Sequence, residues 1–273
     1  MATRPPPRIL SIAGSDSSGG AGIQADIKTI TMLGGYAMTA LTAATAQNSV
    51  GVQAIAPMSP DFVAQQIASC AADIGVDAVK IGMLHDRAII EAVAAELGKL
   101  DPDIPVVLDP VMVSTSGVPL IAPDAMAANE DLLFTRATIL TPNLPELELM
   151  AETQLRSLDR MADAAQALAM EYGCHVLAKG GHTHDARVID LLLAPDGSQA
   201  ISFNHARIDT PHTHGTGCTL SAAIATLLGY GQPLEHAVRL SRQFVFQAIK
   251  AAPGFGAGNG PLGHQAVGRR SES

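Results

Sequence analysis

A short turn in the last third of the chain holds residues that could carry out phosphoryl or acyl transfer. The turn His214-Gly215-Thr216-Gly217-Cys218 runs directly into an apolar pattern with helical spacing. The first amides of a helix lack internal partners and carry partial positive charge, so the turn could bind an oxyanion. A helix N-terminus should also lower the pKa of the thiol, which would let Cys218 act as a base or a nucleophile. The alternative is a glycine-bearing turn before a core helix with one buried cysteine.

Acidic and basic side chains follow three predicted strands, and ligands of parallel α/β sheets bind at such strand ends. Asp109 follows the strand expected at Val106–Leu108, and Glu146 follows the one at Thr138–Leu140. Carboxylates in this place suit Mg²⁺ and phosphate in a kinase. Alternatively, Asp109 could initiate a turn before a proline, and Glu146 could be a charge in the first turn of a helix. Lys179 ends a third strand and could neutralise phosphate charge.

The glycine- and serine-rich segment from Gly14 to Gly22 could accept a small polar substrate. It has neither the dinucleotide-binding nor the Walker spacing, which argues against binding of a nucleoside triphosphate by those routes. In the helix that follows, Asp26 falls on the apolar face, where a carboxylate is costly unless it is paired or bound to a ligand. An aspartate that caps a neighbouring loop would also explain this position. Gln47 ends the next strand, and its amide suits a heterocycle with ring nitrogens.

Two His-x-His pairs lie near these residues, and they comprise His182, His184, His212 and His214. A zinc site is conceivable there, but no Cys-x-x-Cys or second well-spaced ligand pair supports one. The three cysteines are sparse and odd in number, which is typical of free thiols in a reducing compartment. Cys70 and Cys174 lie in helical surroundings and are expected to fill core space.

Composition narrows the class of protein. The chain has 273 residues, 47% hydrophobic residues and a formal net charge of −9. This size permits one large domain with a substantial core. The acidic balance and the 3% aromatic content without tryptophan argue against a nucleic-acid or anionic-membrane partner. No apolar run reaches membrane-spanning length and no signal peptide is evident, so we expect a cytoplasmic protein.

The alternation of short β-branched runs with helical patterns predicts βαβ units, a mainly parallel sheet and helices on both faces. The expected strands are Ile9–Ala13, Met38–Ala46, Ala78–Ile81, Val106–Leu108, Thr138–Leu140 and His175–Ala178. The expected helices are Asp61–Ala72, Ala88–Leu97, Ala125–Leu133, Asp159–Tyr172, Thr219–Leu228 and Leu234–Ala251. Two further runs, Arg187–Ala194 and Gln199–Ile208, predict an antiparallel hairpin on a sheet edge. Pro5–Pro7 and the glycine-rich end from Gly254 look loosely ordered.

Taken in order, the motifs resemble one family. They are Gly14-Ser15-Asp16-Ser17-Ser18-Gly19-Gly20-Ala21-Gly22, Thr45-Ala46-Gln47-Asn48, Lys80-Ile81-Gly82-Met83-Leu84, Val107-Leu108-Asp109-Pro110, Thr141-Pro142-Asn143-Leu144-Pro145-Glu146, Lys179-Gly180-Gly181 and His214-Gly215-Thr216-Gly217-Cys218. This series resembles the hydroxymethylpyrimidine/phosphomethylpyrimidine kinases of thiamin biosynthesis, in the ribokinase superfamily. The resemblance implies a ribokinase-like three-layer sandwich over residues 8–264, with a flexible leader at 1–7 and a flexible tail at 265–273. It also implies a homodimer.

The resemblance implies phosphorylation of 4-amino-5-hydroxymethyl-2-methylpyrimidine by ATP, and then of its monophosphate. By motif, the pyrimidine would be held by Gly14, Asp26 and Gln47. ATP would be contacted by Lys179, Asp109 and Asn143, and Mg²⁺ would be organised by Asp109 and Glu146. The anion hole would consist of Gly215, Thr216, Gly217 and Cys218. Most ribokinase relatives have an aspartate base where Cys218 stands, so the resemblance implies that this thiol is the base.

Three other interpretations remain open at the level of sequence. A pyridoxine or pyridoxal kinase can share this scaffold and even the Gly-Thr-Gly-Cys turn, although Gln47 and the Gly14–Ala25 segment favour the pyrimidine. A non-catalytic pyrimidine sensor could use the same scaffold, but the candidate metal carboxylates, the lysine and Cys218 are all present. A dinucleotide oxidoreductase is disfavoured, because no G-x-G-x-x-G motif follows the first strand.

Overall fold

The computed structural model describes residues 5–112, 123–181 and 186–267, and these ranges fold around one nine-stranded sheet. The strand order is β3-β2-β1-β4-β5-β6-β7-β8-β9. The strands are β1 (Arg8–Asp16), β2 (Tyr36–Gln47), β3 (Val52–Pro57), β4 (Ala78–Ile81), β5 (Val106–Leu108), β6 (Ile139–Leu140), β7 (His175–Ala178), β8 (Arg187–Leu193) and β9 (Ile201–Ala206). The six central strands, in the sheet order β2-β1-β4-β5-β6-β7, are parallel. Antiparallel β3 closes one edge, and antiparallel β8 and β9 close the other. All carboxyl ends of the parallel strands therefore meet at one edge of the sheet.

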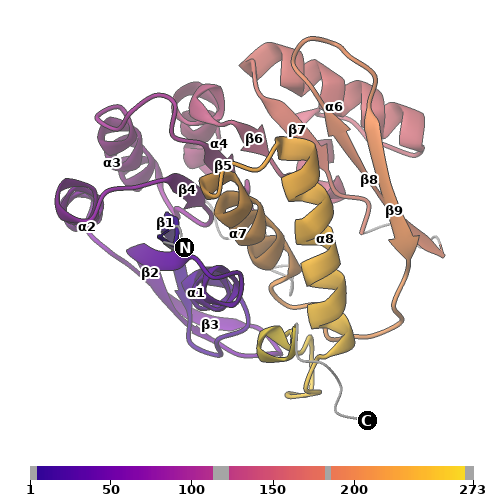
Figure 1. The fold of residues 1–273 in the computed structure, drawn as a ribbon, viewed down its shortest axis with the longest axis horizontal. Helices are drawn as coiled ribbons and strands as arrows, with labels where there is room; N and C mark the ends of the chain where they lie inside the picture. The colour runs from indigo at the N-terminus through magenta and orange to yellow at the C-terminus, as the bar shows by residue number, and fades with distance from the viewer. Residues whose placement is uncertain (1–4, 113–122, 182–185, 268–273) are drawn as a thin grey trace.

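Helices cover both faces of this sheet and make a three-layer sandwich (Figure 1). One face carries α1 (Gly22–Met32), α7 (Thr216–Gly229) and α8 (Leu234–Lys250). The other face carries α2 (Pro60–Asp73), α3 (Arg87–Leu97), α4 (Pro123–Leu132), α5 (Leu144–Met150) and α6 (Leu158–Tyr172). Two short 3₁₀ helices are η1 (Phe134–Arg136) and η2 (His264–Ala266). No helix in the described ranges combines the length and apolarity needed to cross a membrane.

Each face of the sheet has its own apolar core. Along β1, Ile9 packs with the α1–α7–α8 layer, whereas Leu10 and Ile12 pack with the opposite layer. Since both faces are buried, the central strands read as nearly continuous apolar runs rather than as alternating patterns. Some polar residues in the parallel strands are nevertheless buried, among them Ser11 in β1, Thr42 in β2 and Lys80 in β4.

The predicted fold class is confirmed, with a mainly parallel sheet and an antiparallel edge hairpin formed by β8 and β9. Edge strand β3 was not predicted as an element, and α5 was implied only by the alternative interpretation of Glu146 as a charge in the first turn of a helix. The expected loose ends are partly wrong. Pro7 is buried and its carbonyl accepts a hydrogen bond from the Tyr36 amide, so order begins within the expected leader. Residues 254–267 are described and pack on the body of the protein, with His264 1% exposed.

Candidate active site

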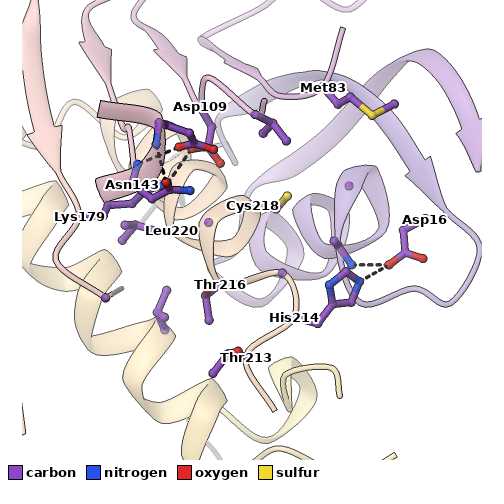
Figure 2. A pocket seen from close by; sticks show the side chains of 18 of the residues that line it. Asp16, Met83, Asp109, Asn143, Lys179, Thr213, His214, Thr216, Cys218 and Leu220 are labelled. Atoms are coloured by element: carbon purple, nitrogen blue, oxygen red, sulfur yellow. Dashed lines mark hydrogen bonds and ion pairs between the residues drawn. The ribbon is translucent and has the colours of Figure 1, made fainter. Parts of the chain in front are cut away.

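A cavity of about 640 Å³ lies at the carboxyl ends of the parallel strands, beside the start of α7. Its walls come from the ends of β1 and β2, from β4 and the segment after it, and from the segments that follow β5, β6 and β7. The N-terminal turn of α7 and parts of β8, β9 and α8 complete the lining. Figure 2 shows Asp109, Asn143 and Lys179 on one side of this cavity and Asp16 and His214 on the other, with Cys218 between the two groups. The topology thus collects, in one place, residues that are far apart in the sequence.

The N-terminus of α7 opens onto the cavity without a side-chain cap. Its N-cap residue is Gly215, which has a φ of 86°, and no side chain caps the first turn. A side chain at Gly215 would collide with the carbonyl oxygen of Gly20, so two loop backbones touch at this point. The Thr216 amide donates to the Thr213 carbonyl over 3.3 Å. The Gly217 and Cys218 amides that follow it have no side-chain cap and can bind a ligand oxyanion. This geometry matches the anion hole predicted for residues Gly215 to Cys218.

Asp109 and Lys179 form an ion pair across from this helix end. The Lys179 Nζ donates to Asp109 Oδ1 over 2.8 Å, and the Thr141 hydroxyl donates to the same oxygen over 3.0 Å. Both side chains are largely buried, with Lys179 13% and Asp109 3% exposed. A Cβ atom placed on Gly217 would lie 3.1 Å from Asp109 Oδ2 and 3.4 Å from the lysine nitrogen. The pair therefore lies directly against the anion-binding turn.

Asn143 and Glu146 begin α5 as a reciprocal capping box. The Asn143 side chain accepts from the Glu146 amide over 3.0 Å, and the Glu146 carboxylate accepts from the Asn143 amide over 2.8 Å. The interpretation of Glu146 as a first-turn helix charge is thus correct, and the side chain also lines the cavity. Burial raises the pKa of Glu146 to about 7, with Lys179 opposing the rise and Asp109 adding to it. A cation near the two carboxylates would lower that pKa.

Asp16 and His214 form a clamp that sequence reasoning did not find. His214 Nε2 lies 2.9 Å from Asp16 Oδ2, and the same carboxylate accepts from the amides of Ser18, Gly20 and Ala21. Burial acts to raise the pKa of Asp16, but the bonds from His214, from Ser18 and from backbone amides outweigh it and leave the pKa lowered. The clamp joins the loop after β1 to the residue before the anion-binding turn. In the sequence, this contact is indicated only by the presence of Asp16 within the glycine- and serine-rich segment Gly14–Gly22.

Gln47 lies beside this clamp on the cavity wall. Its Oε1 accepts from the Thr45 hydroxyl over 3.1 Å, and its Nε2 lies 3.5 Å from His214 Nε2. These contacts orient the amide so that it can meet a polar ring edge in the cavity. Gly14 lies on the same wall, where a Cβ atom would come within 2.6 Å of the Met83 methyl group. Gln47 and Gly14 therefore both lie on the cavity wall.

Cys218 lies in the cavity, but its environment differs from the prediction. Burial raises the pKa of the Cys218 thiol to about 11, with Lys80 opposing the rise, Asp26 and Asp109 adding to it, and a bond from the Gly22 amide lowering it. The expected lowering by the helix N-terminus is outweighed, because desolvation of the sulfur is the larger effect. At neutral pH the unliganded protein therefore holds a neutral thiol at this position.

Asp26 does not line the cavity, which corrects its predicted contact with the pyrimidine. The side chain is fully buried and accepts from Lys80 Nζ over 2.8 Å and from the Ser11 hydroxyl over 2.6 Å. Lys80 does line the cavity. Sequence reasoning could place Asp26 on the apolar face of α1 but could not identify a partner 54 residues away. Of the histidine pairs, His182 and His184 lie outside the described residues.

Comparisons with known proteins point to one family. A family model described as phosphomethylpyrimidine kinase matches residues 16–263. The hydroxymethylpyrimidine/phosphomethylpyrimidine kinase of Bacillus subtilis is 41% identical over 265 residues, which cover 97% of each chain. The thiamine biosynthesis multifunctional protein ThiED of Corynebacterium efficiens is 42% identical over 97% of this chain, which spans only 36% of that protein. The pyridoxal kinase of Staphylococcus aureus, solved with AMP-PCP and pyridoxal, is 32% identical with a TM-score of 0.87, over 97% of this chain and 95% of that one.

Proposed function

The chain belongs to the phosphomethylpyrimidine kinase family, and we propose that its cavity carries out both of the phosphorylations for which its relatives are named. ATP phosphorylates the hydroxymethyl group of 4-amino-5-hydroxymethyl-2-methylpyrimidine, and a second ATP converts the monophosphate to the diphosphate. The observation that carries this proposal is the uncapped N-terminus of α7, which faces the Asp109–Lys179 ion pair across one cavity. Oxyanion-binding amides, a cation and a carboxylate are the groups that phosphoryl transfer needs.

The pyrimidine binds between the loop after β1 and the end of β2. Gln47 is held by Thr45 and lies near His214, so its amide faces the ring with a fixed orientation. Because Gly14 has no side chain, its backbone forms the cavity wall next to the Met83 side chain. In this proposed pose, the substrate hydroxymethyl group points toward Cys218 and the start of α7. Asp26 does not contact the pyrimidine ring; it accepts a bond from Lys80, which lines the cavity.

ATP binds on the side of the cavity formed by the ends of β5, β6 and β7. Lys179 releases part of its interaction with Asp109 to contact phosphate oxygens, and Asn143 lies next to it on the same wall. The amides of Gly215, Thr216, Gly217 and Cys218 receive the negative charge of the phosphoryl group in transfer. Because this helix end is uncapped before the substrate binds, little reorganisation is needed at the moment of reaction.

Asp109 and Glu146 fit a magnesium site. Both are buried carboxylates at neighbouring strand ends. Burial raises the pKa of Glu146 to about 7, and a cation bound beside the carboxylate would stabilise its charged form. Mg²⁺ commonly uses one or two protein carboxylates together with phosphate oxygens and water. When bound, the ion neutralises phosphate charge. Asp109 keeps its bond to Thr141 in this arrangement, which orients its free oxygen toward the cavity.

Cys218 is the proton acceptor of the first step. The small fraction of Cys218 that is ionised takes the proton of the substrate hydroxyl as the new O–P bond forms. ADP leaves with the electron pair of the bond that breaks between the γ-phosphorus and the bridging oxygen. In the second step the acceptor is a phosphate, which is already ionised at neutral pH and needs little help from a base. The importance of Cys218 should therefore differ between the two steps.

The decisive experiment compares three acceptors. The purified protein is incubated with ATP, Mg²⁺ and either the hydroxymethylpyrimidine, its monophosphate or pyridoxal, and products are identified by mass spectrometry. Pyridoxal is included because the S. aureus pyridoxal kinase shares this fold. We expect turnover of both pyrimidines with a higher kcat/KM than for pyridoxal. A preference for pyridoxal without turnover of the monophosphate would overturn the proposal, and pyrimidine binding without ADP release would instead indicate a sensor.

We further propose a homodimer in a reducing, cytoplasmic environment. The three cysteines are free in the structure, which fits such a compartment. Light scattering coupled to size exclusion should give twice the chain mass of 28.2 kDa. A mass that stays at the monomer value across concentrations would contradict the dimer without affecting the proposed chemistry.

A further inference from the structure

A buried ion pair lies beneath the floor of the cavity, on the side of the sheet that carries α1 and α7. Lys80 Nζ and Asp26 Oδ2 are 2.8 Å apart, and both side chains are 0% exposed. The Ser11 hydroxyl donates to the same oxygen over 2.6 Å, and Ser11 is the register partner of Lys80 in the neighbouring strand. The cluster therefore joins β1, β4 and α1 directly behind the catalytic cavity.

The lysine side chain extends toward the carboxyl end of its strand. A Cβ atom placed on Gly82 would lie 2.7 Å from Lys80 Nζ, so the absence of a side chain at Gly82 makes room for the ammonium group. Lys80 is also one of the residues that line the cavity, together with Cys218. Lys80 thus lies next to the cavity and to Cys218, although its side chain and its carboxylate partner are fully enclosed by the core.

Fold stability does not account for such a cluster. Buried ion pairs are commonly no more stable than well-packed apolar residues of similar volume, because desolvation offsets the attraction. Moreover, the second oxygen of Asp26, Oδ1, is buried without any hydrogen-bond partner. An unsatisfied buried carboxylate oxygen is costly, and such a group calls for a role other than packing.

We propose that Lys80 is a positioning residue for the first phosphorylation: its buried ammonium stabilises the negative charge of the Cys218 sulfur, and Asp26 limits that effect. The inference rests on the proposed function of Cys218. The chemistry is the proton transfer already described, in which the thiolate sulfur takes the hydroxyl proton and becomes a thiol while the hydroxyl oxygen bonds to phosphorus. Lys80 touches neither the substrate nor the phosphate and exchanges no proton.

The charged groups around Cys218 act in opposite directions. Lys80 on β4 lowers the pKa of the thiol, whereas Asp26 on α1 and Asp109 after β5 raise it. Lys179 after β7 is a second cation that interacts electrostatically with the sulfur. Although burial opposes the charged form of Lys80, Asp26 and Cys218 raise the pKa of the ammonium and keep it charged at neutral pH. Removing the lysine should therefore make the thiolate rarer, and removing the aspartate charge should make it more abundant.

The test uses this difference in sign. Lys80→Met and Asp26→Asn are each compared with the wild type by the rate at which iodoacetamide alkylates Cys218 between pH 7 and pH 10, followed on the Cys218 peptide by mass spectrometry. At pH 9 we expect a rate about three- to tenfold lower in Lys80→Met and higher by a similar factor in Asp26→Asn, as for a pKa shift of about one unit. Lys99→Met, which removes an exposed lysine from its ion pair with the largely buried Glu96, is the matched control and should change nothing.

Catalysis provides the second readout. The ratio of first-step to second-step kcat should fall in Lys80→Met, since only the first step needs the thiolate. Rates of alkylation that move in the same direction in both variants would overturn the inference, because general loosening of the site would produce that result. If Lys80→Met does not fold, the rise expected in Asp26→Asn alone decides. An unchanged first step in Cys218→Ala would instead refute the proposed base, whatever the alkylation rates show.

Discussion

At the scale of single residues, the position of Cys218 poses a problem that its chemistry must solve. Burial raises the pKa of the thiol to about 11, so a neutral thiol occupies the place of the base at neutral pH. A thiol with that pKa is a strong proton acceptor once ionised but is rarely ionised. The Lys80 ammonium and a bond from the Gly22 amide oppose this rise in the pKa. The residue is therefore useful only where a proton must be removed.

Cys218→Ala tests this difference between the steps. We expect the first phosphorylation to slow by roughly 10²–10⁴-fold, as is usual for loss of a general base, and the second step to slow much less. Single-turnover assays with each pyrimidine measure both. In the wild type, the first-step rate should also rise with pH from 7 toward 9, because the thiolate fraction increases below a pKa of about 11. If the alanine variant keeps the same pH-dependent rise, Cys218 is not the base.

Glu146 leads to a prediction on magnesium. Burial raises its pKa to about 7, so below pH 7 the carboxyl carries a proton that Mg²⁺ must displace. The Mg²⁺ concentration for half-maximal rate should therefore be higher at pH 6 than at pH 8. In Glu146→Gln this concentration should be higher at both pH values, and its pH dependence should be lost. Titrations of Mg²⁺ at the two pH values measure this, and an unchanged pH dependence in the glutamine variant would exclude Glu146 as a ligand.

At the scale of elements, the helices on the two faces of the sheet begin differently. On the face opposite α7, helices α2, α3, α5 and α6 begin with the side chains of Ser59, Asp86, Asn143 and Ser157, each of which accepts a bond from a first-turn amide. On the face of α7, helices α1, α7 and α8 all begin without a side-chain cap, and α7 lines the cavity with its first turn. In the proposed function, the amides at the start of α7 are used for a ligand rather than for a cap.

Two glycines of this turn should respond differently to alanine. Gly215→Ala should lower the free energy of unfolding by about 2 kcal/mol or more, because its φ is 86° and a side chain would strike the Gly20 carbonyl. Gly217→Ala lies in the helix, where alanine is favoured by up to about 1 kcal/mol, so stability should not fall. Its methyl group would nevertheless meet Asp109 Oδ2 at 3.1 Å.

Urea unfolding and kcat/KM together separate these two effects. Gly217→Ala should retain its unfolding midpoint and lose most of its activity, since the methyl group occupies the space between the ion pair and the anion hole. Full activity in this stable variant would show that the turn does not receive the phosphoryl group. A Gly215→Ala variant as stable as the wild type would contradict the described backbone geometry.

The sequence reveals elements best where burial gives them a clear pattern. Buried strands such as Ala78–Ile81 and Val106–Leu108 were predicted with the bounds they have in the structure. Strand β3 was missed, because most of its side chains are exposed and no apolar pattern marks it. The site shows the same division. Residues next to strand ends could be placed at the cavity, but the Asp16–His214 and Asp26–Lys80 pairs join positions 198 and 54 residues apart.

At the scale of the whole molecule, the sheet order brings two groups of strand ends to one cavity. In the proposed function, the loop after β1 and the end of β2 form the pyrimidine side, and the ends of β5, β6 and β7 form the nucleotide side. Helix α7 contacts β1, β4 and β5, and its N-terminal turn lies between the two groups of residues (Figure 2). Each half should therefore bind its own ligand, while the transfer step needs both.

Thermal unfolding with ligands tests this division. A ligand that binds only the folded protein stabilises it by about 2.7 kcal/mol at a hundredfold excess over Kd, which raises Tm by several degrees in a chain of this size. Lys179→Met should lose most of the Tm rise given by a non-hydrolysable ATP analogue with Mg²⁺ but keep the rise given by the pyrimidine. Gln47→Ala should do the reverse. Cys218→Ala should keep both, because the thiol acts on a proton rather than on binding. Loss of both rises in either of the first two variants would mean that the cavity binds its ligands as a single unit, and the assignment of Lys179 and Gln47 to separate halves would then be wrong.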